Sequence, residues 1–431
     1  MTVTIDQIIQ AQGVIERYIN QTPILTSSSL SRMADCQLLL KAENLQRTGS
    51  FKVRGAVNRL SALTSDQREK GVVAASAGNH AQGVAVAASN LGVPATIVMP
   101  EAASLAKIAA TRGYGANVIL LGTNFDEAVA HAKRLQDEHG LTFIPAFDDE
   151  LVIAGQGTIG LELIKEAPEL QMVMVPVGGG GLISGIASAI RGQLPNVKII
   201  GVQSSLAPAV AESYDSKSIR AHRPADTLAD GIAVGRPGEL TLPIILDLVD
   251  DMVLVDDEEI SQAMVLLLER CKLVVEGAGA AGVAAILSGK VSCRGVRVVS
   301  VLSGGNIDVS LLDKVVEHGL TTSGRYLVLK VNMQDRPGRL ARLLELIAGL
   351  KGNVTYVEHH RGGLPLPIGM VEVELEVETR NSDHAEEICQ AMTEAGYSEG
   401  DIGARARVQA RVLGSSASRP LVRSFTELRS N

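Results

Sequence analysis

Short apolar segments alternate with helix-like segments along most of the first two thirds of the chain. The apolar segments have the length of buried strands and occur at residues 37–43, 72–75, 95–99, 117–121, 142–145, 172–177, 198–203, 252–255 and 296–302. Strands that alternate with helices are typical of a parallel sheet covered by helices on both faces. The sequence therefore predicts a two-lobed α/β unit over residues 1–322, with a small lobe inserted at about residues 53–150.

A different pattern begins near residue 323. Strand-like segments at 326–333, 353–360 and 369–377 alternate with helix-like segments at 339–350 and 382–395, and the order leaves room for a strand after Tyr397. The order βαββαβ predicts a small ferredoxin-like α+β domain over residues 323–405. Residues 406–431 are predicted to be a flexible tail.

Composition and charge argue against several classes of protein. Hydrophobic residues make up 46% of the chain, which is enough for a large core, and charged residues only 20%. The formal charge is −8 and no basic block occurs, so no nucleic-acid partner is expected. The four cysteines are scattered without a CxxC pair, which predicts reduced thiols in a cytoplasmic protein and neither disulfides nor a zinc site.

Two charge-free stretches, residues 71–100 and 170–190, are long enough to span a bilayer. Glycine, serine, asparagine, glutamine or proline interrupts each of them, and irregular backbone is not tolerated in contact with lipid. We therefore expect buried strand–loop–helix units and no membrane partner. The N-terminal residues also lack the basic and apolar regions of a signal peptide.

Lys52 lies between two apolar residues, Phe51 and Val53. A lysine in an apolar pocket has a lowered pKa, because burial disfavours its charged form. A neutral amine is a nucleophile and can form a Schiff base with an aldehyde or ketone. The alternative is a lysine at the start of a helix with its amine in water, which is the common situation for this residue type.

Four consecutive glycines, Gly178 to Gly181, follow an apolar strand and precede a helix-like segment. Backbone N–H groups without side chains at a helix start form a binding site for anions, and a phosphate is the natural occupant. The alternative is a glycine turn required only by tight packing. Neither GxGxxG, GxxxxGK[ST] nor GxSxG is completed, so dinucleotide-binding, NTPase and hydrolase functions have no motif to support them.

Two further small-residue loops follow strands, one at residues 76–80 and one at residues 303–306. Loops at the carboxyl ends of parallel strands converge on one crevice in an open α/β sheet. His80 lies in the first of these loops, either as a residue that lines the site or as a packed core histidine.

Taken together, these stretches resemble the threonine/serine dehydratases, which belong to the fold-type II pyridoxal-phosphate enzymes. The resemblance covers about residues 5–320 and rests on four motifs in the family's order: Ser50-Phe51-Lys52-Val53-Arg54-Gly55-Ala56, Ser76-Ala77-Gly78-Asn79-His80-Ala81-Gln82-Gly83, Gly178 to Leu182, and Ser303-Gly304-Gly305-Asn306. Asp335-Arg336-Pro337-Gly338, with Gly352-Asn353-Val354, resembles an ACT domain, an amino-acid-sensing module that follows some of these enzymes.

The resemblance implies pyridoxal 5′-phosphate as the cofactor and a role for each motif. Lys52 would hold the cofactor and serve as the base at Cα, and Ser76 would be a second catalytic residue. The cofactor would also contact Phe51, Asn79 at its ring hydroxyl, Ser303 at its pyridine nitrogen, and Gly178, Gly179, Gly180, Gly181 and Leu182 at its phosphate. The substrate carboxylate would bind to Ser76, Ala77, Gly78, Asn79 and His80.

The implied activity is that of a threonine ammonia-lyase, which removes the β-hydroxyl of L-threonine, and also of L-serine, to give a 2-oxo acid and ammonia. The alternatives are a serine racemase, a hydroxyaspartate dehydratase, or a non-catalytic amino-acid sensor. Some relatives, notably serine racemases, carry acidic ligands for a divalent cation where this chain has Gln203, Ala207 and Ala209. Oxygen-rich cation sites need carboxylates, so no metal site is predicted.

The ACT-like segment predicts regulation by an amino acid. Asp335, Gly338 and Asn353 are the candidate effector residues, with isoleucine or valine as the ligand. The alternative is a domain that only mediates dimerisation. The resemblance also implies a homodimer or homotetramer.

Overall fold

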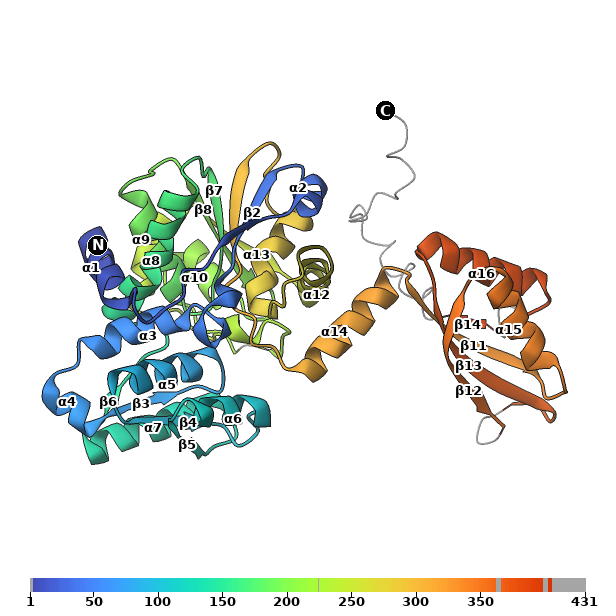
Figure 1. Cartoon of the computed structure of the whole chain (residues 1–431), viewed down its shortest axis with the longest axis horizontal. Coiled ribbons are helices and arrows are strands. Elements are labelled where there is room, and N and C mark those ends of the chain that lie inside the picture. The colour runs from blue at the N-terminus through green and yellow to red at the C-terminus, as the bar shows by residue number, and fades with distance from the viewer. Residues whose placement is uncertain (1–2, 224, 362–365, 398–401, 405–431) are drawn as a thin grey trace. The chain divides into compact units, whose positions relative to one another are not determined.

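The computed structural model describes residues 3–223, 225–361, 366–397 and 402–404 (Figure 1). The chain divides into two units, Met1–Asp308 and Val309–Asn431. The division precedes helix α14 (Val309–Thr322), whereas the sequence pattern predicts a boundary after this segment. The predicted tail, residues 406–431, lies outside the described residues.

A six-stranded sheet with the order β1-β2-β10-β7-β8-β9 forms the larger lobe of the first unit. Only its edge strand β1 is antiparallel to its neighbour, and the other adjacent pairs are parallel. The carboxyl ends of the parallel strands therefore share one edge, where α/β sheets bind ligands. The strands are β1 (Ile24–Thr26), β2 (Gln37–Lys41), β7 (Met172–Pro176), β8 (Lys198–Ser204), β9 (Asp251–Val255) and β10 (Arg297–Val301).

A four-stranded parallel sheet with the order β5-β4-β3-β6 forms the smaller lobe. Its central strand β3 is buried on both faces, because Val72 and Ala74 belong to one hydrophobic cluster and Val73 and Ala75 to another. This alternation explains why the segment is continuously apolar. The strands are β3 (Val72–Ala75), β4 (Ala95–Met99), β5 (Asn117–Leu120) and β6 (Thr142–Phe143).

Helices cover both sheets, as Figure 1 shows. Several begin with a side chain that caps the first turn, such as Thr4 with Gln7, which stabilises the helix start. No helix of the described residues combines the length and apolar character needed to cross a membrane. The helices of this unit are α1 (Ile5–Ile15), α2 (Ser28–Ala34), η1 (Glu43–Leu45), η2 (Arg47–Gly49), α3 (Lys52–Ser61), α4 (Ser65–Lys70), α5 (Asn79–Leu91), α6 (Leu105–Gly113), α7 (Phe125–His139), α8 (Glu150–Glu166), α9 (Gly181–Arg191), α10 (Ala209–Ser216), η3 (Asp230–Ile232), α11 (Thr241–Leu248), α12 (Asp257–Leu266), η4 (Leu267–Cys271) and α13 (Gly277–Leu287).

Helix α3, which begins with Lys52, is packed closely between α5 and α8 at glycines. A methyl group added at Gly155 of α8 would lie 2.6 Å from Gly55 Cα, and one added at Gly83 of α5 would lie 3.1 Å from the Lys52 carbonyl carbon. Backbones can approach this closely only where a side chain is missing. The glycines therefore fix the position of the first turn of α3.

A buried network of charges anchors the same helix to the larger lobe. The Arg54 guanidinium donates to Glu43 at 2.8 Å and to Glu162 at 2.6 Å, and Lys41 Nζ lies 2.7 Å from Glu162. Burial alone would raise the pKa of Glu43, but the charge and hydrogen bonds of Arg54 outweigh it and lower that pKa. Each buried charge thus has a partner, without which its burial would be costly.

The second unit holds a four-stranded antiparallel sheet with the order β12-β13-β11-β14. Alternate residues of β11 and β13 pack with both of its helices around one hydrophobic core. The elements are β11 (Tyr326–Gln334), α15 (Arg339–Gly349), β12 (Asn353–His360), β13 (Met370–Glu378), α16 (Ser382–Glu394) and β14 (Ile402–Ala404). The predicted α/β fold and the predicted ferredoxin-like order βαββαβ are both confirmed.

Candidate active site

The segment that carries Lys52 is joined to the loop that follows β10. Ser50 and Gly304 form an isolated antiparallel bridge, and the Phe51 N–H donates to Ser303 O at 3.2 Å. Strands β2 and β10 are parallel neighbours with Lys41 opposite Val301, so their following loops start side by side. The structure therefore brings Lys52 and Ser303 together, although they are far apart in the sequence.

The amine of Lys52 lies in a largely buried site. Its Nζ donates to Ala146 O at 2.9 Å and lies 5.1 Å from the centre of the Phe51 ring. Burial lowers the pKa of Lys52 to about 8, and the negative charge of Glu276 opposes part of this shift. A sizeable fraction of this amine is therefore neutral slightly above neutral pH, as a nucleophile or a base requires.

The loop after β3 contributes the N-terminus of α5. The Ser76 hydroxyl accepts a hydrogen bond from the Gly78 N–H at 3.1 Å, which shapes the turn. A methyl group added at Gly78 would meet nothing within 4 Å, so this turn borders open space. Gly78 provides no side chain to cap α5, and the free N–H groups of the first turn, beginning at Asn79, can bind a carboxylate.

Asn79 and His80 differ in what they offer to a ligand. Asn79 Nδ2 donates to Glu276 Oε1 at 2.7 Å, while Asn79 Oδ1 is buried and has no hydrogen-bond partner in the described part of the chain. His80 is buried, and its Nε2 lies 2.9 Å from Ile144 O, which can only accept. Burial, followed by the charge of Lys52, lowers the pKa of His80 to about 3, so its imidazole is neutral. His80 thus packs beside the site and is not a general acid.

The four-glycine loop joins β7 to α9. Gly180 has φ +97°, a conformation that favours glycine, and a methyl group there would lie 2.7 Å from Ile245 Cδ1. A methyl group at Gly179 would lie 2.4 Å from the Phe147 ring. Packing therefore requires these glycines, and the first-turn N–H groups of α9, beginning at Gly181, are left to bind an anion.

The structure adds residues to the site to which the sequence analysis gives no role. Ala146 O holds the Lys52 amine, and Phe147 packs against the glycine loop. Glu276, which precedes α13, bonds to Asn79. Contacts made by a main-chain carbonyl or by a distant aromatic ring leave no sequence signal. Glu276 does leave one, because glutamate is not among the preferred residues for the N-cap position.

Two polar contacts connect the small lobe to the large lobe near this site. Lys107 Nζ of α6 lies 3.1 Å from Asp230 Oδ2, and the Ser104 hydroxyl donates to Asp308 Oδ1 at 2.9 Å. Burial alone would lower the pKa of Lys107, but Asp230 and the neighbouring carboxylates outweigh it and raise that pKa. Lys107 is therefore a charged group at the junction of the two lobes.

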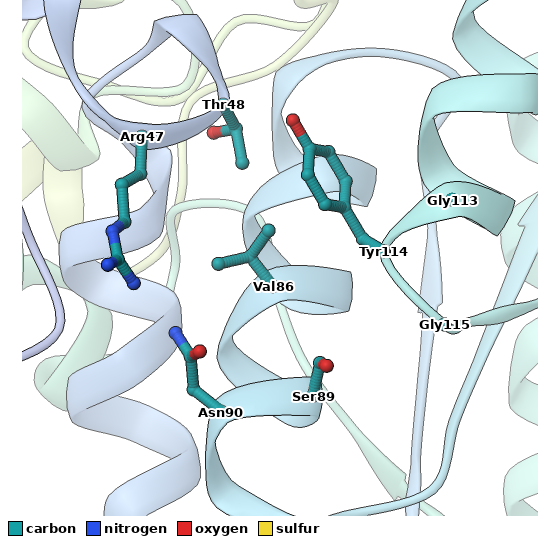
Figure 2. A pocket seen from close by; sticks show the side chains of 8 residues that line it. All are labelled: Arg47, Thr48, Val86, Ser89, Asn90, Gly113, Tyr114 and Gly115. Carbon is teal, nitrogen blue, oxygen red and sulfur yellow. The ribbon is translucent and has the colours of Figure 1, made fainter.

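A separate pocket of about 470 Å³ lies between η2, α5 and the end of α6 (Figure 2). Thr48 Oγ1 is buried at this place without a hydrogen-bond partner among the described residues, and Thr48 has φ +65°. None of the candidate site residues lines this pocket. It is lined by Arg47, Thr48, Val86, Ser89, Asn90, Gly113, Tyr114 and Gly115.

The candidate metal positions have a different function here. The Gln203 side chain accepts hydrogen bonds from the N–H groups of Val210 at 3.1 Å and Ala211 at 3.0 Å, and so caps α10. Ala207 and Ala209 are buried and offer no side-chain ligand. No group of three or more acidic, histidine or cysteine side chains suited to a metal ion occurs in the described parts of the chain.

The candidate effector residues do not form one site within a single chain. Asn353 pairs with Glu378 at the end of the sheet where β11 begins, whereas Asp335 and Gly338 follow the other end of β11. Asp335 forms an ion pair with Arg361 at 3.3 Å, and Gly338 caps α15 with φ +82°. The sheet therefore separates Asn353 from the other two.

A half-buried lysine amine and two helix N-termini at the edge of parallel sheets define a cofactor-dependent α/β enzyme. Residues 15–304 match the sequence family described as pyridoxal-phosphate dependent enzyme. The chain belongs to this family and uses its cofactor, pyridoxal phosphate.

Two bacterial relatives match nearly the whole chain. The L-threonine ammonia-lyase of Thermotoga maritima is 48% identical over 92% of this chain and 98% of its own length. The L-threonine ammonia-lyase of Geobacter sulfurreducens is 50% identical over 90% of this chain and 96% of its own length. Among solved structures, maize serine racemase is similar with a TM-score of 0.71 at 37% identity, covering 74% of this chain and 99% of that chain.

The residues present fit pyridoxal phosphate. An aldehyde needs an amine, and the pKa of Lys52 is lowered to about 8. A phosphate needs donors, and the glycine loop exposes the first-turn N–H groups of α9. A polar ring needs hydrogen-bonding partners, and Asn79 Oδ1 is buried without one in the described chain. Lys52 and the glycine loop follow strands of the large sheet, and Asn79 of the small lobe lies beside them through its bond to Glu276.

Proposed function

We propose that this enzyme is a threonine ammonia-lyase that converts L-threonine to 2-oxobutyrate and ammonia, and L-serine to pyruvate and ammonia. The observation that carries the proposal is the amine of Lys52, whose pKa is lowered to about 8 beside a helix N-terminus that can hold a carboxylate. The two relatives named as L-threonine ammonia-lyases support the choice of threonine, because they match more than nine tenths of their own length.

In this proposal the cofactor would be held by Lys52 at its aldehyde, by residues 178–182 at its phosphate, by Asn79 and Ser303 at its ring, and by Phe51 beside it. When bound, pyridoxal phosphate withdraws electrons from the substrate's Cα and so makes the Cα proton acidic. The hydroxyl of Ser303 is neutral, so it does not hold a proton on the ring nitrogen as an aspartate would. A neutral partner at this position would favour prompt loss of the β-hydroxyl.

The protein's own groups orient the substrate and remove its Cα proton. The substrate carboxylate binds to the first-turn N–H groups of α5 and to Ser76, which fixes the Cα–H bond relative to the Lys52 amine. Once the amine of the substrate has taken its place at the aldehyde, the freed Lys52 would remove the Cα proton as a neutral base. His80 contributes its shape and no proton, because its pKa is lowered to about 3.

An assay of the purified enzyme loaded with pyridoxal phosphate tests this function. We expect 2-oxobutyrate and ammonia in equal amounts from L-threonine, and pyruvate from L-serine at a lower rate. Lys52→Ala is expected to abolish both reactions while the far-ultraviolet circular dichroism is unchanged. Absence of a keto acid from both substrates would contradict the proposal.

A serine racemase is the second candidate, and the similarity of the maize serine racemase structure favours it. Two observations weigh against it. The sequence identity is higher to the ammonia-lyases, at 48–50% against 37%. Gln203 also takes the place of an acidic cation ligand and caps α10 instead. Chiral analysis of L-serine reactions distinguishes the two, since a racemase accumulates D-serine as its main product.

We further propose that the second unit is an ACT-like domain in a cytoplasmic homo-oligomer, and that it binds isoleucine or valine. The turn from Asp335 to Gly338 would form one side of the effector site. Because Asn353 lies at the opposite end of the sheet, it would contribute to that site from a second copy of the chain. Threonine saturation curves with and without millimolar isoleucine or valine test this, and identical curves would contradict it.

A further inference from the structure

Glu276 occupies the N-cap position of α13 but makes no capping hydrogen bond with its side chain. Its carboxylate accepts a hydrogen bond from Asn79 Nδ2 at 2.7 Å, and Asn79 is the first residue of α5. Glu276 is 5% exposed. The residue therefore connects the starts of two helices, where a serine, threonine or aspartate would have served its own helix better.

The backbone after β10 holds this carboxylate in place. The Glu276 N–H donates to Gly304 O at 3.1 Å, and a methyl group added at Gly304 would lie 2.3 Å from Glu276 Oε1. The backbone of Asn306 also faces the carboxylate and opposes the rise in its pKa. The Glu276 side chain thus has a fixed place between the loop that carries Ser303 and the first turn of α5.

The bond to Glu276 determines how Asn79 presents its amide. A carboxylate can only accept hydrogen bonds, so Asn79 must turn its NH₂ group toward it, since Oδ1 would be repelled. Asn79 is then left with one further N–H and with Oδ1, which is buried and unpaired within the described residues. Both groups remain available for a ring bound in front of Lys52.

We propose that Glu276 is a positioning residue, which holds the Asn79 amide in the orientation that binds the ring of pyridoxal phosphate. This inference rests on the proposed contact of Asn79 with the cofactor. It does not depend on which amino acid is the substrate, because cofactor affinity is measured without a substrate. The two proposals can therefore fail separately.

Other charges face Glu276 and have to be separated from this hydrogen bond. Burial, followed by the charge of Asp230, raises the pKa of Glu276 to about 7, while the bond from Asn79 and the charge of Lys107 oppose the rise. The charge of Lys52 also lies within reach of Glu276. Measurements at pH 8.5 keep Glu276 mostly ionised.

A double-mutant cycle on the Kd for pyridoxal phosphate tests the proposal, with absorbance titration of the cofactor-free enzyme as the measurement. We expect Glu276→Ala and Asn79→Ala each to weaken binding about tenfold, as loss of a charge-assisted or ring hydrogen bond does. The double variant should bind no worse than Asn79→Ala, within about twofold, because Glu276 acts through Asn79. The proposal would be overturned if the rise in Kd of the double variant equalled the product of the rises in the two single variants. An unchanged Kd in Glu276→Ala would also overturn it.

Two further variants distinguish the proposed hydrogen-bond role from misfolding and from a general effect of charge on cofactor affinity. Glu276→Gln keeps an acceptor oxygen for Asn79 and should bind within about threefold of the wild type, whereas binding as weak as that of Glu276→Ala would contradict positioning by a hydrogen bond. Asp230→Asn removes a charge near Glu276 without touching Asn79, and should leave the Kd within about twofold. A loss in Asp230→Asn as large as in Glu276→Ala would also overturn the proposal.

Discussion

The Phe51 N–H donates to Ser303 O, and this bond ties the residue before the reactive lysine to the loop that follows β10. The Ser50–Gly304 bridge lies directly beside it. The relative position of Lys52 and Ser303 is therefore set by main-chain bonds, which do not depend on the rotamer of any side chain. Rigid placement of this kind is what an enzyme needs in order to orient a reacting group.

The close contact between α3 and α8 predicts a loss of stability in Gly155→Ala. The added methyl group would lie 2.6 Å from Gly55 Cα, so the helices must separate, which costs about 2–3 kcal/mol. Gly13→Ala in α1 is the matched control, since a methyl group there meets nothing within 4 Å and should add about 0.5–1 kcal/mol. Urea denaturation of both variants is the measurement, and equal stabilities would refute the close contact.

The lowered pKa of Lys52 predicts a pH-dependent cost to folding of the cofactor-free protein. The folded pKa is about 8 against an ordinary 10.5, so the cost is fully present below pH 8 and disappears as the pH rises toward 10.5. Lys52→Met should therefore stabilise the cofactor-free protein by about 1–2 kcal/mol at pH 7, after allowance for partial exposure and the lost bond to Ala146 O. Denaturation at pH 7 and pH 9.5 should show a smaller difference at the higher pH, and a difference of the same size at both would contradict it.

The buried charge network predicts that Arg54→Met is strongly destabilising. Glu43 and Glu162 would lose their buried partner, at a cost of about 3–5 kcal/mol at pH 7. Because the pKa of Glu43 is lowered in the folded state, this contribution is present above its ordinary pKa of 4.5 and is lost as the pH falls.

Arg59→Met on the same helix is the control for this prediction. Its ion pair with Asp149 is partly exposed, so removing it should cost about 1 kcal/mol or less. Thermal unfolding at pH 7 and pH 4 compares the two variants with the wild type. A similar loss of stability in both variants at pH 7 would show that the buried Arg54 network contributes no more than the exposed ion pair.

The backbone conformation of Gly180 predicts weaker cofactor binding in Gly180→Ala. Its φ of +97° and the contact with Ile245 leave no room for a methyl group, so the loop must shift and its N–H groups lose their alignment. We expect the Kd for pyridoxal phosphate to rise at least about tenfold. Gly192→Ala at the other end of α9 is the control, because its methyl group would be 3.6 Å from Ile5, an ordinary contact. Equal affinities in the two variants would refute the phosphate role of the loop.

Much of the first unit could be predicted from the sequence, because its strands and loops are marked by residues that are neighbours in the sequence. Each glycine-rich loop directly follows an apolar strand in the sequence. Because the strands are parallel, these loops lie at one edge of the sheet. Lys52 and Ser303 meet for this reason. Helix α14 is not among the predicted helices, although its buried and half-buried residues Leu312, Val315, Val316 and Gly319 recur at helical spacing.

Contacts that depend on the register of distant segments could not be predicted. The hydrogen bond between Asn79 and Glu276 joins residues that are 197 positions apart, and the sequence around either residue does not indicate its partner. The separation of Asn353 from Asp335 follows from strand pairing in the second sheet, which the order of elements alone does not determine. The resemblance to an ACT domain therefore predicted a single site for residues that are separated within one chain.

Reduction of the loaded enzyme with borohydride, followed by peptide mapping with mass spectrometry, tests whether Lys52 is the residue that holds the cofactor. Borohydride fixes pyridoxal phosphate to the lysine that holds it. We expect the label on the peptide that contains Lys52, in a one-to-one ratio with the chain, and no label in Lys52→Ala. A label on another lysine, or an equal label in Lys52→Ala, would show that Lys52 does not hold the cofactor.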